Sequence, residues 1–287
     1  MISIIIASVN AQQLNDIRIN IEETVGIPYE ILVFNNANGH KGLCEIYNLG
    51  AKQAKYDLLC YMHEDISIKT RNWGQIVLSA FAEITKLGLI GIAGSSYKSI
   101  APSGWFCNGG PAKINYINIL QRFKFDQLGT SHHLQNPKNE KISQVVAVDG
   151  VWFCTTKTCV TKYPFDEVTF KKFHCYDIDY SLAIRNEYKA YVTFEILLEH
   201  FSEGNYDSNW VEETLKLHNK WANSLPVNLE NLSEKEMKIT EKHAFRFFFK
   251  RMQITGYSKI QRIKVLLKSK LSKKIGTGIF LKLLFEA

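Results

Sequence analysis

The stretch LCEIYNLGAKQAKYDLLCYMHEDI, Leu43 to Ile66, decides the expected fold. Its first half, Leu43 to Ala54, has the apolar spacing of a helix. Tyr56 to Met62 is the continuous apolar run typical of a strand buried on both faces of a parallel sheet. Three titratable residues, His63 to Asp65, follow at once. A helix that leads into a buried strand predicts a βαβ unit, with polar groups at the carboxyl end of its strand.

The same alternation of strand and helix patterns extends on both sides of this stretch. It predicts an α/β fold with a Rossmann-like, mostly parallel central sheet flanked by helices. Regular alternation stops between Ser95 and Ser143, which reads as loop-rich. The other expected elements are strands at Ile2 to Ser8, Tyr29 to Asn36, Leu89 to Gly94, Gln144 to Thr156 and Ala190 to Ile196, and helices at Trp73 to Leu87 and Tyr176 to Glu187.

The composition indicates a soluble chain with a substantial core. Of its 287 residues, 46% are hydrophobic and 22% are charged, which suits one large α/β domain with an appendage. The six cysteines have neither the spacing of a zinc site nor that of a disulfide framework. The first ten residues lack the basic region of a signal peptide, and no apolar run reaches the ~18 residues of a membrane span. We therefore expect a cytoplasmic protein.

The net charge of +7 is unevenly distributed. Glu241 to Ala287 holds twelve Lys and Arg against two Glu, whereas Met1 to Thr240 holds 23 against 26. Apolar residues recur at helical spacing between the basic residues of this tail, so residues 226–287 are expected to form a basic amphipathic helical region. It would lie on an anionic membrane surface at the inner face of the cell membrane, bind a partner or form a homo-oligomer, or pack as an ordinary helical subdomain. Nucleic acid is not expected, because the main body is acidic.

Polar residues follow several of the expected strands, at the edge where ligands bind in open α/β sheets. The glycine-rich dinucleotide fingerprint is missing after the first strand, and the P-loop and the Gly-x-Ser-x-Gly motif are missing as well. A nucleotide held without a glycine cradle needs another counter-charge, which a cation bound by carboxylates supplies. The strand ends are Ser8 to Asn10, Asn35 and Asn36, His63 to Asp65, Asp149 and Gly150, and Glu199 and His200.

Four motifs in order resemble the family-2 glycosyltransferases of the GT-A fold, and within them the branch typified by a streptomycin-biosynthesis protein. They are ISIIIASVN, VFNN, the stretch from Leu43 to Ile66, and YDIDYSLAIR. The resemblance covers Met1 to Asp207 and implies a GT-A glycosyltransferase domain over residues 1–225. It implies an enzyme of the hexosyltransferase type. Such an enzyme moves a sugar, with inversion, from a nucleotide-diphosphate sugar, with a UDP-sugar favoured, to a hydroxyl of a glycan or lipid-linked acceptor.

The resemblance implies a divalent cation, Mn²⁺ or Mg²⁺, on the diphosphate. Its ligands would be Asp65, His200 and His63, and Glu64 would face the ribose or support the ligands. His63 stands where the family usually has Asp, and a mixed His and carboxylate set suits Mn²⁺ better than Mg²⁺. The alternative interpretation of the triplet is an acidic turn.

Asp177 falls on the position of the catalytic base, and Tyr176 replaces the Glu that usually precedes it. A base takes the proton of the acceptor hydroxyl as the anomeric carbon is attacked. The N-terminus of the expected helix favours the ionised carboxylate, so we expect Asp177 to be ready at neutral pH. Capping of the helix by Asp177 and Asp179 is the alternative.

The resemblance implies further contacts to donor and acceptor. Trp152 offers an aromatic face to a sugar ring, with core packing as the alternative. Two rival functions are a sugar nucleotidyltransferase, whose glycine-rich basic loop is missing here, and a non-catalytic nucleotide-sugar-binding or membrane-associated scaffold protein. The expected donor contacts are Ser8, Asn10, Asn35, Asn36, Lys41, Asn48 and Glu64, and the expected acceptor contacts are Asp149, Trp152 and Asp179.

Overall fold

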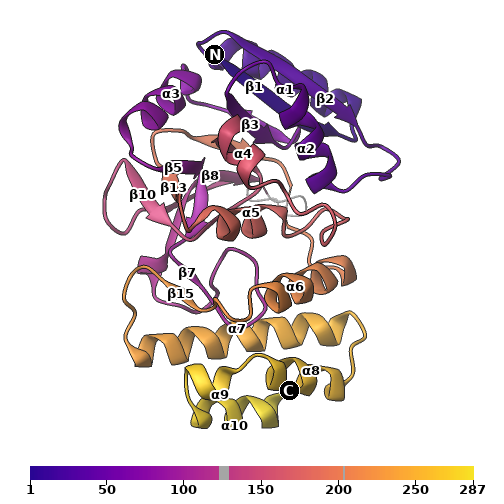
Figure 1. Ribbon diagram of the computed structural model, residues 1–287, viewed down its shortest axis with the longest axis vertical. Helices are drawn as coiled ribbons and strands as arrows, with labels where there is room; N and C mark the ends of the chain where they lie inside the picture. The colour runs from indigo at the N-terminus through magenta and orange to yellow at the C-terminus, as the bar shows by residue number, and fades with distance from the viewer. Residues whose placement is uncertain (123–128, 203) are drawn as a thin grey trace.

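A computed structural model describes residues 1–122, 129–202 and 204–287 of the protein. Figure 1 shows a sheet region covered by helices at the top and a stack of helices below it. The strands are β1 (Ile2–Ser8), β2 (Tyr29–Asn35), β3 (Leu58–Met62), β4 (Ile66–Ile68), β5 (Leu87–Gly91), β6 (Ala93–Ser95), β7 (Tyr97–Lys98), β8 (Asn115–Arg122), β9 (Thr130–Gln135), β10 (Ile142–Val145), β11 (Ala147–Val148), β12 (Trp152–Thr156), β13 (Lys189–Thr193), β14 (Leu198–His200) and β15 (Val227–Asn228). The helices are α1 (Ala11–Thr24), α2 (Leu43–Gln53), α3 (Trp73–Glu83), a 3₁₀ turn (Ala112–Ile114), α4 (Lys157–Lys162), α5 (Tyr176–Ile184), α6 (Ser208–Lys220), α7 (Glu234–Ile254), α8 (Lys259–Lys268), α9 (Leu271–Lys274) and α10 (Thr277–Glu286).

The larger sheet has seven strands in the described part of the chain, in the order β10-β13-β5-β12-β3-β1-β2. β1 pairs in parallel with β2 and β3, and β13 pairs in parallel with β5. β12 runs antiparallel between β3 and β5, and β10 is antiparallel to β13. The predicted α/β class is therefore confirmed, but the sheet is mixed rather than mostly parallel.

The apolar run of β1 is buried on both faces of this sheet. Ile2, Ile4 and Ile6 join the core that α1 and α3 cover, whereas Ile5 joins the core under α2, α4 and α5. Alternate side chains of a strand point to opposite faces, so an unbroken apolar run is what a strand between two helical layers requires. The carboxyl end of β1 meets those of β2 and β3, where the polar residues follow.

A second sheet brings a distant strand to the triplet after β3. Its order is β11-β6-β8-β14-β4, and β9 pairs with β8. β14 runs antiparallel to β4, with His200 opposite Ile66. Ser95 to Ser143 was expected to be loop-rich, yet β8 and β9 lie in it; its residues 123–128 fall outside the described ones. The pairing of β14 places His200 beside Asp65.

The tail forms helices, as predicted, and they pack on the main body. The core of α7 to α10 includes Ile100 and Ala101 from the loop after β7, and Trp210 from α6. Ser233 is the N-cap of α7 and Ser258 is the N-cap of α8, and each forms a capping box. Among the described residues, no helix combines the length and the apolarity that a membrane span requires.

Candidate active site

A cavity of about 650 Å³ opens at the carboxyl ends of β1 and β3. Its walls come from both sheets, from the first turn of α5 and from one face of α7. Ligands bind at this edge in open α/β sheets, and the volume is within the range of small-molecule sites. The acidic and imidazole side chains that line it include His63, Glu64, Asp65, Asp149, Asp177 and His200.

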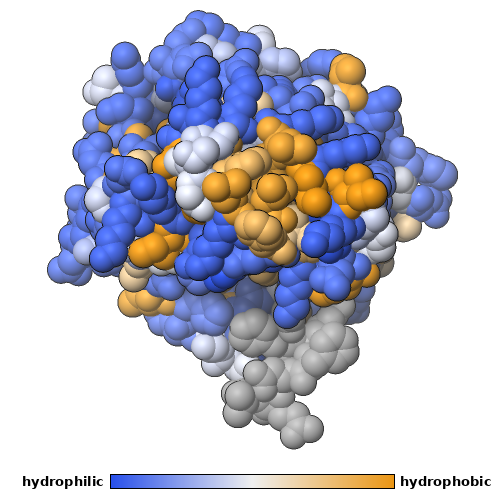
Figure 2. Space-filling view, turned by 90° about the horizontal axis from the view of Figure 1, so that it is seen from below, coloured by the Kyte–Doolittle hydropathy of each residue, from blue (hydrophilic) through white to orange (hydrophobic). Residues whose placement is uncertain are grey.

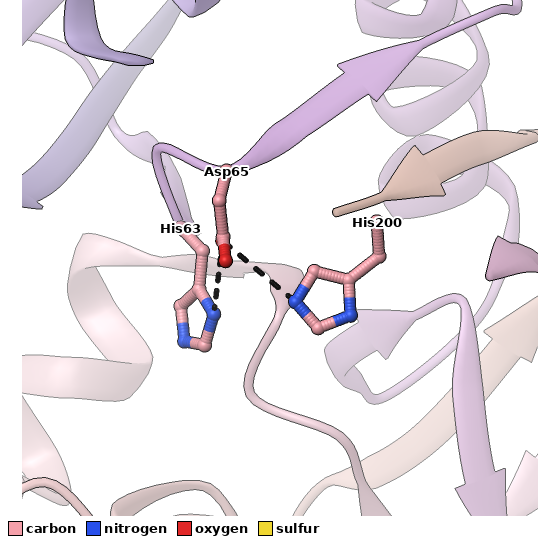
Figure 3. A group of neighbouring side chains, drawn as sticks. All are labelled: His63, Asp65 and His200. Carbon is pink, nitrogen blue, oxygen red and sulfur yellow. Dashed lines mark ion pairs between the residues drawn. The ribbon is translucent and has the colours of Figure 1, made fainter. Parts of the chain in front are cut away.

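Two imidazoles and one carboxylate converge on one wall of this cavity (Figure 3). The Oδ1 of Asp65 is 3.8 Å from the Nδ1 of His63 and 3.7 Å from the Nε2 of His200. The three ligand atoms lie within 4.8 Å of one another. One cation can therefore contact all three, and two ring nitrogens with one carboxylate oxygen suit a transition-metal dication such as Mn²⁺.

The charges around Asp65 favour its ionised form. Burial raises the pKa of Asp65, but the neighbouring rings of His63 and His200 outweigh it, so the pKa is lowered overall. Burial lowers the pKa of His200, so its ring favours the neutral form that binds metals. Asp65 and His200 thus favour the protonation states that a divalent cation requires.

The hydroxyl of Tyr176 fixes the orientation of His63. It donates to the carbonyl of Gly150 at 3.1 Å and lies 3.0 Å from the Nε2 of His63. A hydroxyl has one proton, so Nε2 must be the donor in the second contact, which leaves the lone pair of Nδ1 for the side of Asp65. Gly150 permits this arrangement, because a Cβ at this position would lie 2.1 Å from the Tyr176 oxygen.

Glu64 joins the triplet to the loop after β1. Its Oε1 accepts hydrogen bonds from the backbone amides of Val9 and Asn10, both at 2.8 Å. Its Oε2 is buried and has no partner among the described residues. Because Glu64 lines the cavity, this oxygen can accept a hydrogen bond from a ligand donor such as a hydroxyl group.

Asp177 lies in the first turn of α5 and lines the same cavity. Burial, and then the charge of Asp149, raises the pKa of Asp177 to about 7. Its Oδ1 accepts a hydrogen bond from the amide of Ile178 at 2.8 Å, but such backbone bonds do not offset burial. The expected preference for the ionised carboxylate at the helix N-terminus is present in these backbone bonds, but burial outweighs it. A carboxylate with a pKa near 7 is poised to exchange a proton at neutral pH.

The comparison that decides the family covers most of the chain. A model described as a glycosyltransferase-like family matches residues 3–239. The chain belongs to this glycosyltransferase-like family. No curated protein sequence matches it. The narrower streptomycin-type branch stays a prediction.

Solved structures similar to this glycosyltransferase-like protein confirm its fold. S. aureus TarS 1–349 in complex with UDP matches with a TM-score of 0.54 at 10% identity, over 95% of this chain and 81% of that one. GalNAc-T7 with UDP, GalNAc and Mn²⁺ matches with a TM-score of 0.52 at 12% identity, over 96% of this chain and 58% of that one. At such identities the likeness is one of fold, and it supports the predicted GT-A class.

Three residues predicted to contact substrate in the glycosyltransferase-like protein lie away from the cavity. Trp152 is fully buried, and its indole packs edge-on against Trp73 with ring centroids 5.8 Å apart, so it offers no face to a sugar. The carboxylate of Asp179 accepts from the indole of Trp221 at 2.8 Å and pairs with Lys220. Asn48 bonds to both backbone polar groups of Phe165. Each of these side chains stabilises the fold instead.

Of the remaining predicted donor contacts, Asn36 lines the cavity, whereas Ser8, Asn10, Asn35 and Lys41 are not among its lining residues. The side chain of Asn36 bonds to the backbone of Lys41. The side chain of Asn10 accepts from two amides at the start of α1. Asn35 accepts from the amide of Ala37, Ser8 is buried in β1, and Lys41 pairs with Glu45.

Sequence reasoning missed the wall that α7 provides. Ala244 and Phe247 line the cavity, with Tyr206 beside Phe247 at 5.4 Å between ring centroids. The guanidinium of Arg251 lies 4.7 Å from the ring centre of Tyr206 and 5.1 Å from that of Phe247. The signal was present in the spacing of Ala244, Phe247 and Arg251, which share one face of a helix.

Proposed function

We propose that the protein is a metal-dependent, inverting glycosyltransferase. It transfers a hexosyl group from a nucleotide-diphosphate sugar, with a UDP-sugar as the expected donor, to a hydroxyl of a glycan or lipid-linked acceptor. The observation that carries the proposal is the pairing, in one cavity, of a cation-binding cluster with a carboxylate whose pKa is about 7. The first suits a diphosphate leaving group and the second suits an acceptor hydroxyl.

His63, Asp65 and His200 are the proposed ligands of the cation. When bound, Mn²⁺ or Mg²⁺ stabilises the negative charge that the nucleoside diphosphate gains on departure. The two ring nitrogens favour Mn²⁺, because Mg²⁺ prefers an all-oxygen shell. Tyr176 acts as a positioning residue, because its hydroxyl holds His63 with Nδ1 unprotonated.

Glu64 is the proposed partner of the donor nucleotide. Its buried Oε2 lacks a donor within the described residues, and a ribose hydroxyl would supply one. Asn36 lies on the same side of the cavity, after β2. A UDP-sugar donor is also supported by the two similar structures, since TarS is in complex with UDP and GalNAc-T7 holds UDP, GalNAc and Mn²⁺.

Asp177 is the proposed general base. It takes the proton of the acceptor hydroxyl while the acceptor oxygen bonds to the anomeric carbon and the bond from that carbon to the diphosphate breaks. Attack from the face opposite the leaving group inverts the anomeric centre. The charge of Asp149 helps to raise the pKa of Asp177, which strengthens the base. General-base help of this kind contributes roughly 10²–10⁴-fold to the rate.

The acceptor is proposed to lie between Asp177 and the wall formed by α7. Asp149 lines this side, and Tyr206 and Phe247 add aromatic rings that suit the apolar face of a sugar. A glycan and a lipid-linked sugar share this chemistry. We also propose that residues 1–225 form the glycosyltransferase domain and residues 226–287 the basic helical region, whose α7 adds one wall to the cavity. We further propose that the protein works in the cytoplasm at the inner face of the cell membrane.

The test is incubation with a panel of nucleotide-sugars and a mixed acceptor pool, with Mn²⁺, with Mg²⁺ and with a chelator. We expect release of the nucleoside diphosphate with one donor, more with Mn²⁺ than with Mg²⁺, and none from Asp177→Asn. Asp57→Asn, an exposed change of the same kind, serves as the matched control. Absence of both turnover and nucleotide binding with every donor would contradict the enzyme.

A non-catalytic nucleotide-sugar-binding protein is the second candidate. The observation that favours it is His63, which stands where the resembling family usually has Asp. This candidate predicts donor binding by calorimetry without release of nucleoside diphosphate under any of the conditions above. It also predicts that Asp177→Asn binds the donor and the acceptor as the parent does.

A further inference from the structure

The lower face of the molecule exposes apolar side chains that its core does not use (Figure 2). Ile260 and Leu267 on α8 are 66% and 59% exposed, and Leu281 and Phe285 on α10 are 50% and 82% exposed. In Figure 2 hydrophobic residues gather near the centre of this face, with hydrophilic ones around them. We call these four residues the apolar stripe.

Helical spacing explains why the stripe is continuous. Ile260 and Leu267 are seven residues apart, and Leu281 and Phe285 are four apart, so each pair lies on one side of its helix. α8 and α10 are in contact with each other and with α7. The inner sides of these helices already supply the packed core, where Leu266 and Leu283 are fully buried. The stripe therefore faces outward in addition to a complete core.

Lysines flank the stripe. Lys264 and Lys268 on α8 and Lys282 on α10 are exposed. In the described ranges no ion pair is formed by Lys264 or Lys268, and Lys282 is near the charge of Glu286, one turn further along α10. The only acidic residue of α8 to α10 is Glu286, and Arg246 pairs with it. The face thus combines apolar side chains with a strong positive charge, against which α8 to α10 set a single acidic side chain, Glu286.

We propose that the apolar stripe and its lysines dock on an anionic membrane surface. The apolar side chains enter the boundary between headgroups and acyl chains, and the lysines contact lipid phosphates. A second copy of the chain fits the face less well, because a symmetric contact would bring two lysine-rich surfaces together. A polyanion that lacks an apolar phase would bind the lysines but leave Phe285 and Leu281 in water. A lipid surface accommodates both the lysines and these two apolar side chains.

The docked orientation also fixes where the cavity stands relative to the membrane. α7 packs on α10 with one side, and its Ala244 and Phe247 line the cavity with another. Two helix layers, α7 and the layer of α8 and α10, therefore separate the proposed membrane face from the cavity (Figure 1). This last step rests on the proposed function, and it points to an acceptor whose sugar is carried on a lipid. The docking itself does not depend on catalysis.

The test is co-sedimentation of the full chain with vesicles of phosphatidylcholine, with and without phosphatidylglycerol. We expect binding to the anionic vesicles only, weakened by salt. The triple change Lys264→Gln, Lys268→Gln and Lys282→Gln should weaken binding by at least about tenfold, since each lysine near such a surface contributes about fivefold. The double change Leu281→Ser and Phe285→Ser should weaken it similarly. The matched control removes three exposed lysines elsewhere: Lys52→Gln, Lys86→Gln and Lys189→Gln.

Three results would overturn the docking. The first is equal binding to neutral and anionic vesicles. The second is a control triple variant that loses as much vesicle binding as the test triple. The third is a chain that does not bind vesicles but forms a dimer in lipid-free solution, which Phe285→Ser dissociates. Circular dichroism checks that each variant is folded, which the exposure of the changed side chains favours. Vesicle binding without any sugar transfer would leave the docking intact and contradict only the proposed enzyme.

Discussion

Two groups of polar side chains, both with carboxylates, differ in how fully their members are hydrogen-bonded. The first is the cavity group, Glu64, Asp65 and Asp177. The second, which we call the polar bridge, joins Lys98 of β7 to Glu241 of α7 through their neighbours. In the cavity group one buried oxygen of Glu64 has no partner within the described part of the chain, and burial with a nearby charge raises the pKa of Asp177 to about 7.

The polar bridge satisfies its members. The ammonium of Lys98 donates to the carbonyl and the hydroxyl of Ser103, at 2.9 and 2.6 Å, and contacts the Nε2 of His218 at 3.0 Å. The carboxylate of Glu241 accepts from the hydroxyl of Tyr97 and from the amides of Ile100 and Ala101, at 2.7 to 2.9 Å.

The contrast separates two uses of buried polarity. A buried titratable group that has all its partners holds the fold together, as the polar bridge holds α7 to the loop after β7. A group that opens on a cavity and lacks partners is available to a ligand. The predictions below test this distinction, from the largest expected effect to the smallest.

Asp177→Asn should lower sugar transfer by about 10²–10⁴-fold, because the amide cannot take a proton. Donor binding and the free energy of unfolding should not fall, since the carboxylate opens on the cavity. Initial rates, calorimetry with the donor and urea unfolding measure the three quantities. Sugar transfer at the parent rate, or a large loss in the free energy of unfolding, would show that Asp177 stabilises the fold, as the polar bridge does.

Glu241→Ala should lower the free energy of unfolding by about 2–5 kcal/mol, because it leaves the buried amides of Ile100 and Ala101 without an acceptor. Urea unfolding measures the loss, and Glu22→Ala on the exposed side of α1 is the control. Transfer per folded molecule should be less affected than by Asp177→Asn. A free energy of unfolding equal to that of the parent would contradict the structural role of the polar bridge.

Tyr176→Phe sharpens the comparison, because Tyr176 is fully bonded yet supports a cavity residue. Without the hydroxyl, His63 can protonate either nitrogen, so we expect Mn²⁺ affinity to fall by about 10–100-fold. Calorimetry with the metal alone measures this without any substrate. Nitrogen NMR of the His63 ring should show protonated Nε2 in the parent and a mixture in the variant.

The pH dependence of transfer should show the smallest change. Asp177 is protonated below about pH 7, so kcat/KM should rise with pH through this value and level off above it. The charge of Asp149 raises the pKa of Asp177, so Asp149→Asn should move the rising limb to lower pH. A rising limb at the same pH in Asp149→Asn would show that the charge of Asp149 does not affect the pKa of Asp177.

The local elements were predictable from the sequence, and their long-range pairing was not. β1, β2 and β3 follow from apolar runs, and the helices between them follow from helical spacing. The insertion of β12 between β3 and β5 depends on contacts far apart in sequence, which a uniformly apolar strand does not specify. The same limit explains why β8 and β9 were expected to be loops.

Which residue types gather at the site was predictable, but the direction of single side chains was less so. His63, Asp65 and His200 come together, as the sequence indicated, but they do so because a second sheet, which was not expected, places β14 beside β4. Asp179 follows Asp177 by two residues, which is about 200° around a helix, so the two carboxylates cannot share one cavity. Trp152 lies within β12, where its side chain faces the core under α3. Residue identity alone does not give these directions.

The position of α7 also sets an order of assembly during synthesis. A ribosome completes every strand of the two larger sheets before it reaches Glu234, the first residue of α7. A nascent chain at that stage can pair its strands, yet its cavity lacks the wall of Ala244 and Phe247. The amide of Ile100 also still awaits Glu241. The cavity therefore gains its last wall from the helix that immediately precedes the lysine-rich lower face.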